Sequence, residues 1–379
     1  MKTLSNQLAF TIVLLAFLNG CNQEKKNDTG QEQTAPVSDT AKYTMEDFGS
    51  VAKINTHIHF KTFDTTFIVQ ARKDNFKLVT VNVNSSYSPS IEEQQELAVN
   101  LVKLYPKDLA YATTISVEDF DEPEWEQKTI AYLKKSFENG AIAVKIWKNV
   151  GMELKDKNGK YVMIDDPKFD SVLDFMEQNN VTFLGHIGEP KNAWLPVDKM
   201  TVSGDKSYFS EHPQYHMYLH PDYPTHEQII AARDHMLEKH PKLRFVGAHL
   251  GSLEWDTDEL AKRLEKYPNM AVDMAERISH FQYQAVTDWQ KVYDFFIKYQ
   301  DRLIYATDET VSEKTPVDGI GQRAHENWLE HWQYFTSSGK MKVPDVEKEF
   351  NGLGLPRTVV DKIYRENARK WFAGLATLE

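Results

Sequence analysis

The stretch Asn55-Thr56-His57-Ile58-His59 completes a run of β-branched and apolar residues that begins at Val51. Alternate residues of a β-strand point to the same side, so both histidines would project together from the end of one strand. Imidazoles in that position can hold a divalent cation such as zinc, manganese or iron. A pair with this spacing also arises by chance, and the rest of the sequence decides how it is interpreted.

Short apolar runs of the same kind recur along the chain, and longer amphipathic stretches separate most of them. The eight runs are 51–57, 77–83, 109–116, 141–147, 181–186, 243–249, 270–274 and 303–307. The amphipathic stretches are 91–104, 124–138, 167–178, 225–239, 256–266 and 286–299. This alternation predicts parallel strands joined by crossover helices, and eight such units predict a closed (β/α)₈ barrel with further helices over 357–375. An open, doubly wound sheet is the structural alternative.

Polar residues that can bind metal or carry charge stand at the ends of several predicted strands. His186 ends the fifth, His249 the sixth and Asp308 the eighth, and Lys145 lies within the fourth. Taken singly, each is as well explained by packing. The C-terminal ends of barrel strands converge on one face, however, and we therefore expect these side chains to meet the histidine pair in one site.

With these residues assembled, the chain resembles the amidohydrolase superfamily, which has His-x-His on the first strand, His on strands five and six, and Asp on strand eight. The phrases His249-Leu250-Gly251, Thr307-Asp308 and Glu366-Asn367-Ala368 are similar to the branch that contains decarboxylases and lactone hydrolases. The resemblance extends over residues 50–375. It implies a metal-dependent enzyme and leaves the substrate open.

The resemblance implies that His57, His59, His186 and Asp308 bind one divalent ion, Zn or Mn, which lowers the pKa of a bound water and makes hydroxide available. Asp308 would then accept the proton of that water and pass it to the leaving group.

The resemblance also implies that His249 orients or polarises the substrate or the water. Lys145 has two alternative roles. A carboxylated Lys145 would bridge two metals, with His249 as a ligand of the second, whereas with one metal Lys145 would hold a substrate carboxylate. We favour one metal.

Three further residues are candidates for substrate binding. Glu189 follows His186 by three residues and could support or join the metal ligands, and a plain carboxylate at the barrel rim explains it equally well. Arg277 lies just past the seventh strand, where a surface ion pair would explain it equally well. His216 belongs to a loop of about 40 residues after the fifth strand, rich in aromatic residues and histidine; a loop of that length is often functional, although packing onto the barrel also accounts for it.

The N-terminus predicts export and lipid attachment. Residues 1–20 contain one charge, an apolar run too short to span a bilayer, and the ending Leu18-Asn19-Gly20-Cys21, which resembles the lipobox of bacterial lipoproteins. We expect a signal peptide over 1–20, lipid on Cys21, a flexible tether over 21–45 and the catalytic domain over 46–379. The protein would then be anchored in the bacterial cell envelope.

Composition limits the partners. The net charge of −12 argues against nucleic acid, because phosphate binding requires a basic surface. Cys21 is the single cysteine of the 379 residues, so disulfides within the chain and cysteine-based metal sites are excluded. We expect a small-molecule substrate and leave a homo-oligomer open.

The best-supported function is hydrolysis of a small lactone, amide or ester. Decarboxylation of a small carboxylic acid is the alternative within the same fold, and a non-catalytic, ligand-binding lipoprotein is the alternative outside enzymes. The complete set of expected metal ligands favours an enzyme.

Overall fold

The strands predicted from the sequence form one parallel sheet in the computed structural model, which describes residues 41–315 and 319–377. From β1 to β8, strands adjacent in the sequence are adjacent in the sheet, and β9 lies beside β1, in the order β8-β7-β6-β5-β4-β3-β2-β1-β9. Their bounds are β1 Lys53–Phe60, β2 Phe76–Val81, β3 Leu109–Thr114, β4 Ala143–Ile146, β5 Thr182–Gly185, β6 Arg244–Gly247, β7 Met270–Asp273, β8 Leu303–Ile304 and β9 Glu309–Val311. Residues of β2 to β7 are almost all buried, as expected for parallel strands covered on both faces.

The eighth predicted strand is divided in two, and its parts join the two edges of the sheet. β8 pairs with β7, whereas β9 pairs with β1. Between them, the carbonyl of Tyr305 accepts a hydrogen bond from the backbone of Thr56, and the N–H of Asp308 donates one to the carbonyl of His57. Because one continuous segment bonds to both edge strands, the sheet curls into a barrel. The predicted (β/α)₈ fold class is confirmed, and the open sheet is wrong.

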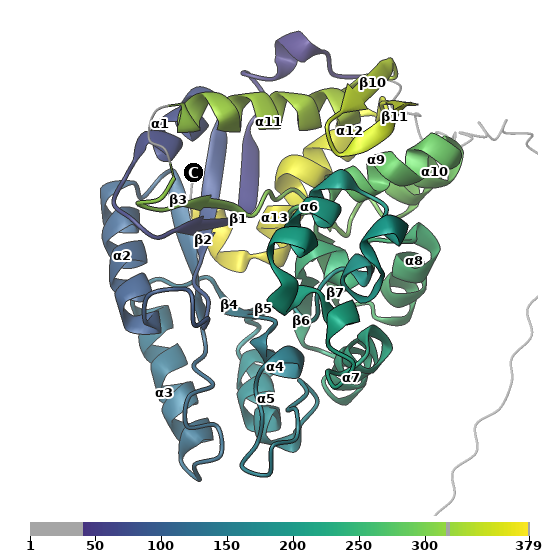
Figure 1. The fold of residues 1–379 in the computed structure, drawn as a ribbon. Coiled ribbons are helices and arrows are strands. Elements are labelled where there is room, and N and C mark those ends of the chain that lie inside the picture. Colours follow the sequence, from purple (N-terminus) through teal and green to yellow (C-terminus); the bar gives the residue numbers. More distant parts are fainter. Residues whose placement is uncertain (1–40, 316–318, 378–379) are drawn as a thin grey trace, which may run out of the picture. The chain divides into compact units, whose positions relative to one another are not determined.

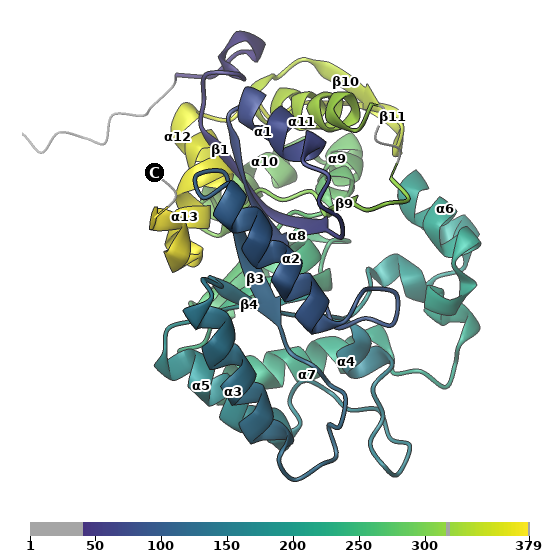
Figure 2. The same ribbon diagram turned by 90° about the vertical axis from the view of Figure 1, so that its left-hand side faces the viewer.

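Helices follow most strands and lie around the outside of the sheet (Figure 1). Their bounds are α1 Thr66–Lys73, α2 Ile91–Leu104, α3 Trp125–Glu138, α4 Asn149–Met152, α5 Asp170–Gln178, α6 Ser203–Glu211, α7 His226–Lys239, α8 Thr257–Lys266, α9 Ile278–Thr287, α10 Trp289–Lys298, α11 Ile320–Thr336, α12 Arg357–Asp361 and α13 Asn367–Trp371. Figure 2 looks onto α2 and α3, which cover β3 and β4.

Local chemistry explains where these helices begin. The hydroxyl of Ser90 accepts a hydrogen bond from the backbone of Glu93, whose carboxylate accepts one from the backbone of Ser90 in return, and this capping box starts α2 at its predicted residue. The predicted helix 286–299 is instead α9 followed by α10. Asp288 leaves the helical conformation between them and caps α10 by accepting a hydrogen bond from the backbone of Lys291.

The sequence analysis assigned no element between 308 and 356, where the structure has α11 and a hairpin of β10 Lys340–Val343 and β11 Val346–Asn351. α11 contributes Trp328 and Trp332 to the core, and both are fully buried. The ring of Trp328 lies 4.5 Å from that of Phe76 at the start of β2. This helix thus closes the barrel wall next to β1 and β2.

The long loop after β5 forms a cap of short helices, including α6, and we call residues 190–224 the cap. The backbone N–H of Ser203, at the start of α6, donates to the carbonyl of Asp345 in the turn of the β10–β11 hairpin, at 3.1 Å. The cap therefore rests on the hairpin, two parts of the chain that are far apart in sequence.

The described chain begins before the predicted domain start at residue 46. Lys42 forms an antiparallel bridge with Pro356, and the hydroxyl of Tyr43 donates to Asp361 at 3.0 Å. The signal peptide, the lipid on Cys21 and most of the tether fall on residues outside those described, and they stay predictions. Within the described residues, helices that combine the length and the apolar composition needed to cross a bilayer are absent.

A glycine at the end of β6 tests this packing. An added Cβ on Gly247 would lie 2.9 Å from the Cα of Gly251, because the chain turns back on itself directly after the strand. We expect Gly247→Ala to lower the free energy of unfolding by about 1–3 kcal/mol, measured by urea denaturation. Gly49→Ala is the matched control, because an added Cβ there meets no atom within 4 Å. Equal effects of the two substitutions would contradict this account.

Candidate metal centre

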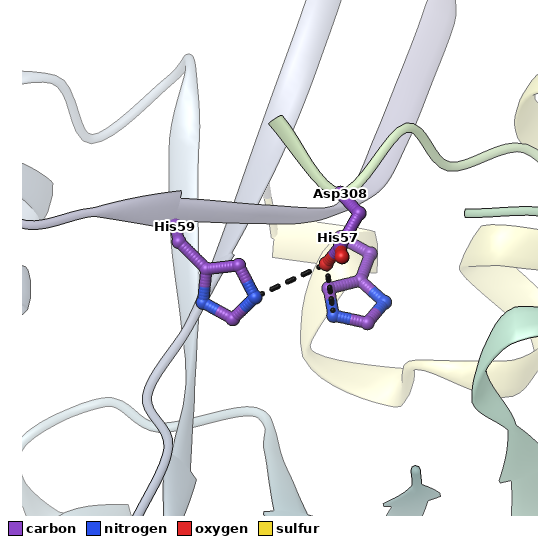
Figure 3. Close-up of side chains that lie close together, drawn as sticks. All are labelled: His57, His59 and Asp308. Atoms are coloured by element: carbon purple, nitrogen blue, oxygen red, sulfur yellow. Dashed lines mark hydrogen bonds and ion pairs between the residues drawn. The ribbon is translucent and has the colours of Figure 1, made fainter. Parts of the chain in front are cut away.

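His57, His59 and Asp308 form a group that could hold a metal ion, and their potential ligand atoms all lie within 4.8 Å of one another. The Oδ1 atom of Asp308 is 3.0 Å from Nε2 of His57 and 3.1 Å from Nε2 of His59 (Figure 3). The two histidines project from the same side of β1, as their spacing predicts, and Asp308 comes from the segment that closes the barrel.

The hydrogen-bond partners of the two imidazoles indicate which ring nitrogens are available to bind a cation. Nδ1 of His57 lies 2.9 Å from the carboxylate of Asp273, and Nδ1 of His59 lies 2.9 Å from the carbonyl of Val81. Both partners only accept hydrogen bonds, so each Nδ1 carries a proton, and in the neutral form of either ring the lone pair of Nε2 faces the Asp308 carboxylate. Acceptor atoms that face one another at this distance repel, and a divalent cation between them removes the repulsion. The residues fit a metal.

Asp273, the last residue of β7, supports this group from behind. It is fully buried, and its Oδ2 accepts from Nδ1 of His57. Its Oδ1 accepts from the backbone N–H of His249 at 2.8 Å and from that of Ala275 at 3.2 Å. A carboxylate bonded to the far nitrogen of a ligating histidine fixes the tautomer and the ring orientation. Asp273 thus orients His57, a predicted metal ligand, and His249, a predicted catalytic residue.

Two further buried imidazoles face the same region. His249 donates through Nδ1 to the carbonyl of Ala275 at 3.0 Å, and its Nε2 has no hydrogen-bond partner among the described residues. Nε2 of His186 is likewise without such a partner, and the rings of the two residues lie 4.2 Å apart. Burial lowers the pKa of His249 to about 3 and holds that of His186 well below its usual range. Both rings are therefore neutral, the form that binds metal or polarises a substrate.

His186 lies outside the group of three whose ligand atoms converge within 4.8 Å. It lines the same cavity as Asp308, with its free Nε2 buried in the wall. Its role as the fourth ligand stays a prediction.

Lys145 is fully buried on β4, and its Nζ lies 3.0 Å from Nε2 of His57. Burial lowers its pKa to about 8, although the negative charges of Asp273 and Asp308 act in the opposite direction. The amine therefore competes for the lone pair that a metal would use. Both roles predicted for Lys145 remain compatible with this position.

Non-glycine residues with left-handed backbone conformation follow three successive strands. His249 after β6, Glu276 after β7 and Asp308 after β8 have φ values of 56°, 57° and 66°. Such conformations are uncommon for residues with a side chain, and they persist where the surrounding structure enforces them. Here they lie at the ends of strands that line one cavity, so the strain is concentrated at the site.

Two connected cavities surround the group. One, of about 400 Å³, is lined by Lys145, Trp147 and residues of the cap that include Tyr208, His212 and Tyr215. The other, of about 350 Å³, is lined by His249, Glu276, Arg277 and Asp205. Lys148, His186, Tyr208 and Asp308 line both. We call the two together the catalytic cavity.

Glu189 and Arg277, two of the substrate-binding candidates, are already held by ion pairs. Glu189 is buried and pairs with Lys148. Arg277 lies 3.8 Å from Asp205 on α6, which also pairs with His280 at 3.3 Å. The two contacts of Asp205 fasten the cap to Arg277 in the loop after β7 and to His280 on α9. Arg277 still has an Nε atom without a hydrogen-bond partner among the described residues, so it keeps capacity to bind an anion.

His216, the third candidate, lies within the cap. It is buried, its Nε2 is 2.8 Å from the carbonyl of Leu195, and its ring packs near Phe209. Other residues line the cavities described above. These contacts fit packing of the cap, and contact with substrate stays a prediction.

Sequence reasoning missed Asp273, Lys148 and Tyr208. Asp273 ends a predicted strand in the same way as Asp308 does, and that position was an available signal. Lys148 follows Trp147 directly after the fourth strand, and Tyr208 is one of several aromatic residues in the cap. Neither of these two is distinguished from its neighbours by sequence pattern.

A model of the amidohydrolase family matches residues 119–374, a range that includes His186, His249 and Asp308. No curated protein matches the chain by sequence. Among solved structures, 2,6-dihydroxybenzoate decarboxylase from Rhizobium is 13% identical, with a TM-score of 0.50 over 85% of this chain and 98% of the decarboxylase. An uncharacterised TIM-barrel protein from Bordetella bronchiseptica is 15% identical, with a TM-score of 0.48 over 86% of this chain and all of that one, 100%. At such identities the likeness concerns the fold alone.

The position of Asp273 leads to a prediction about metal affinity. We expect Asp273→Asn to weaken metal binding by about 10–100-fold, because the amide cannot hold the His57 ring as the carboxylate does. Competition with a coloured chelator measures the affinity. Asp74→Asn is the control, since Asp74 is also a buried carboxylate 2.9 Å from a histidine, His325, but outside the metal centre. A similar change in both variants would show that loss of a buried carboxylate, rather than of this contact, is responsible.

Proposed function

Because this chain belongs to the amidohydrolase family, we propose that it is a metal-dependent hydrolase that cleaves a small lactone, amide or ester. The observation that carries the proposal is the convergence of two histidine lone pairs on the carboxylate of Asp308 at 3.0 and 3.1 Å. A divalent ion held by His57, His59 and Asp308 would polarise a carbonyl group and lower the pKa of water beside it.

Asp308 is suited to act as the general base. Burial opposes its ionisation, but the histidines around it, His57 foremost, hold its pKa well below the usual range. The carboxylate is therefore ionised at neutral pH and can take a proton from water and return it to the leaving group. His249, which lines the catalytic cavity, is neutral, and its Nε2 has no hydrogen-bond partner among the described residues, so this ring can orient the substrate or a water.

Decarboxylation of a small carboxylic acid remains the second candidate. The Rhizobium decarboxylase shares the fold, and Arg277 offers an unpartnered guanidinium nitrogen to a substrate carboxylate. The same metal group would serve either reaction, so the test must distinguish the products.

The first test is the metal content of the purified full-length protein by elemental analysis. We expect about one Zn or Mn per chain, because one group of converging ligand atoms is present among the described residues. Removal of the metal with a chelator should abolish activity, and either ion added back should restore it. Hydrolysis is followed on a panel of lactones, amides and esters, and carbon dioxide release is followed on aromatic acids.

Two metals per chain would instead support a carboxylated Lys145 that bridges them. Absence of metal after growth with added ions would refute the proposal. Carbon dioxide release without hydrolysis would replace the hydrolase with the decarboxylase.

Substitutions within the site separate metal binding from chemistry. We expect His57→Ala and Asp308→Asn to lose both metal and activity while the circular dichroism spectrum is retained, because the hydrophobic core lies elsewhere. His249→Asn should lower kcat by about 10²–10⁴-fold with metal content unchanged, as befits a group that orients substrate. Loss of metal from His249→Asn would assign this residue as a ligand and overturn its proposed role.

A further inference from the structure

A third cavity, of about 270 Å³, opens off the catalytic cavity on the side of α11. The two share Glu276, Arg277 and Asp345 in their walls. Glu330 on α11 and Gln282 on α9 also line it. We call this space the acidic chamber, because three carboxylates and one guanidinium face it.

Among the described residues that line the acidic chamber, Arg277 is the only cation for three carboxylates, and it already lies 3.8 Å from a fourth, that of Asp205. The side chain of Glu330 has no hydrogen bond or ion pair to another described residue. Burial raises the pKa of Glu330 and of Asp345, and the negative charge of a neighbouring carboxylate adds to the effect in each case. His331, which also lines the chamber, does not offset them, since burial lowers its pKa to about 4 and leaves it neutral. A cationic ligand would remove this repulsion.

A second, independent feature shows that the ligand must also accept hydrogen bonds. Gln282 is 2% exposed, lines the chamber, and has an Nε2 atom without a hydrogen-bond partner among the described residues. The Nε atom of Arg277 is also buried and without a hydrogen-bond partner among the described residues. Buried donors of this kind are costly unless something bonds to them. A bare metal ion would satisfy the carboxylates but would leave both donors unpaired.

We propose that the acidic chamber binds the amino acid that amide cleavage releases, with its carboxylate at Arg277 and Gln282 and its amino group, an ammonium ion once released, at Glu276, Glu330 and Asp345. A zwitterion of this size supplies a cation and an acceptor together. The chamber adjoins the catalytic cavity through Arg277, so one molecule can reach from Asp308 into it.

This assignment deepens the proposed function, on which it rests for the reaction, by selecting an amide as the bond that is cleaved. Water adds to the acyl carbon, the carbon–nitrogen bond breaks, and the nitrogen of the leaving group gains a proton from Asp308. The new carboxylic acid then gives its proton to the released amine, so at neutral pH the products are a carboxylate and an ammonium ion, and all atoms and charge are accounted for. The acidic chamber would receive the ammonium ion as it forms.

The test uses three probes of equal chain length: β-alanine, which carries both groups, propylamine, which carries only the ammonium, and propionate, which carries only the carboxylate. Isothermal titration on the full-length, metal-loaded protein should rank β-alanine first and propionate last, because carboxylates outnumber the guanidinium. In Glu330→Gln, Kd for β-alanine and propylamine should rise roughly fivefold, and that for propionate should not rise. Glu276→Gln should give the same pattern.

Glu326→Gln is the matched control, since Glu326 is an exposed carboxylate of the same helix outside the chamber. Equal responses of the Glu330 and Glu326 variants, strongest binding of propionate, or no binding of β-alanine at millimolar concentration would each overturn the proposal.

Repeating the titration after removal of the metal separates this proposal from the proposed function. Binding of β-alanine should survive this removal, although hydrolase activity is lost. Binding of β-alanine by a metal-loaded chain that hydrolyses no amide, lactone or ester would support the acidic chamber and refute the hydrolase. Amide hydrolysis by a chain that does not bind β-alanine would support the hydrolase and refute the acidic chamber.

Discussion

The contact between Asp273 and His57 determines how the rest of the site is arranged. The buried carboxylate fixes the tautomer of His57 and so directs its lone pair at Asp308. With its other oxygen it holds the backbone N–H of His249. One side chain on β7 thus positions residues from β1 and from the turn after β6, and the convergence that favours a metal is a consequence of that placement.

The fold could be predicted from the sequence because its signals are local. Apolar runs alternate with amphipathic stretches, and Ser90 and Glu93 mark the start of α2. The division of the eighth strand could not be predicted, since it depends on the left-handed conformation of Asp308 and on pairing with β1. α11 was missed because its tryptophans meet β2 only in the folded barrel, and no alternating strand signals its presence.

In the site, too, some residues could be predicted from local sequence signals, whereas other features depend on contacts between segments distant in the sequence. His57, His59 and Asp308 were predicted together, because their strand-end positions bring them to one face of a barrel. The burial of Lys145 beside His57, the pairing of Glu189 with Lys148 and the fastening of the cap through Asp205 depend on contacts between distant segments. Such contacts leave no periodic pattern in the sequence.

The segment from β8 to β9, which closes the barrel, has a consequence for biogenesis. His59 and Asp308, which are 249 residues apart, are brought together by the same segment that bonds β9 to β1, and the backbone of Asp308 bonds directly to that of His57. Partial chains emerging from synthesis would carry the two histidines without their carboxylate. The complete group therefore exists only in the closed barrel, and an ion bound there would be acquired after folding.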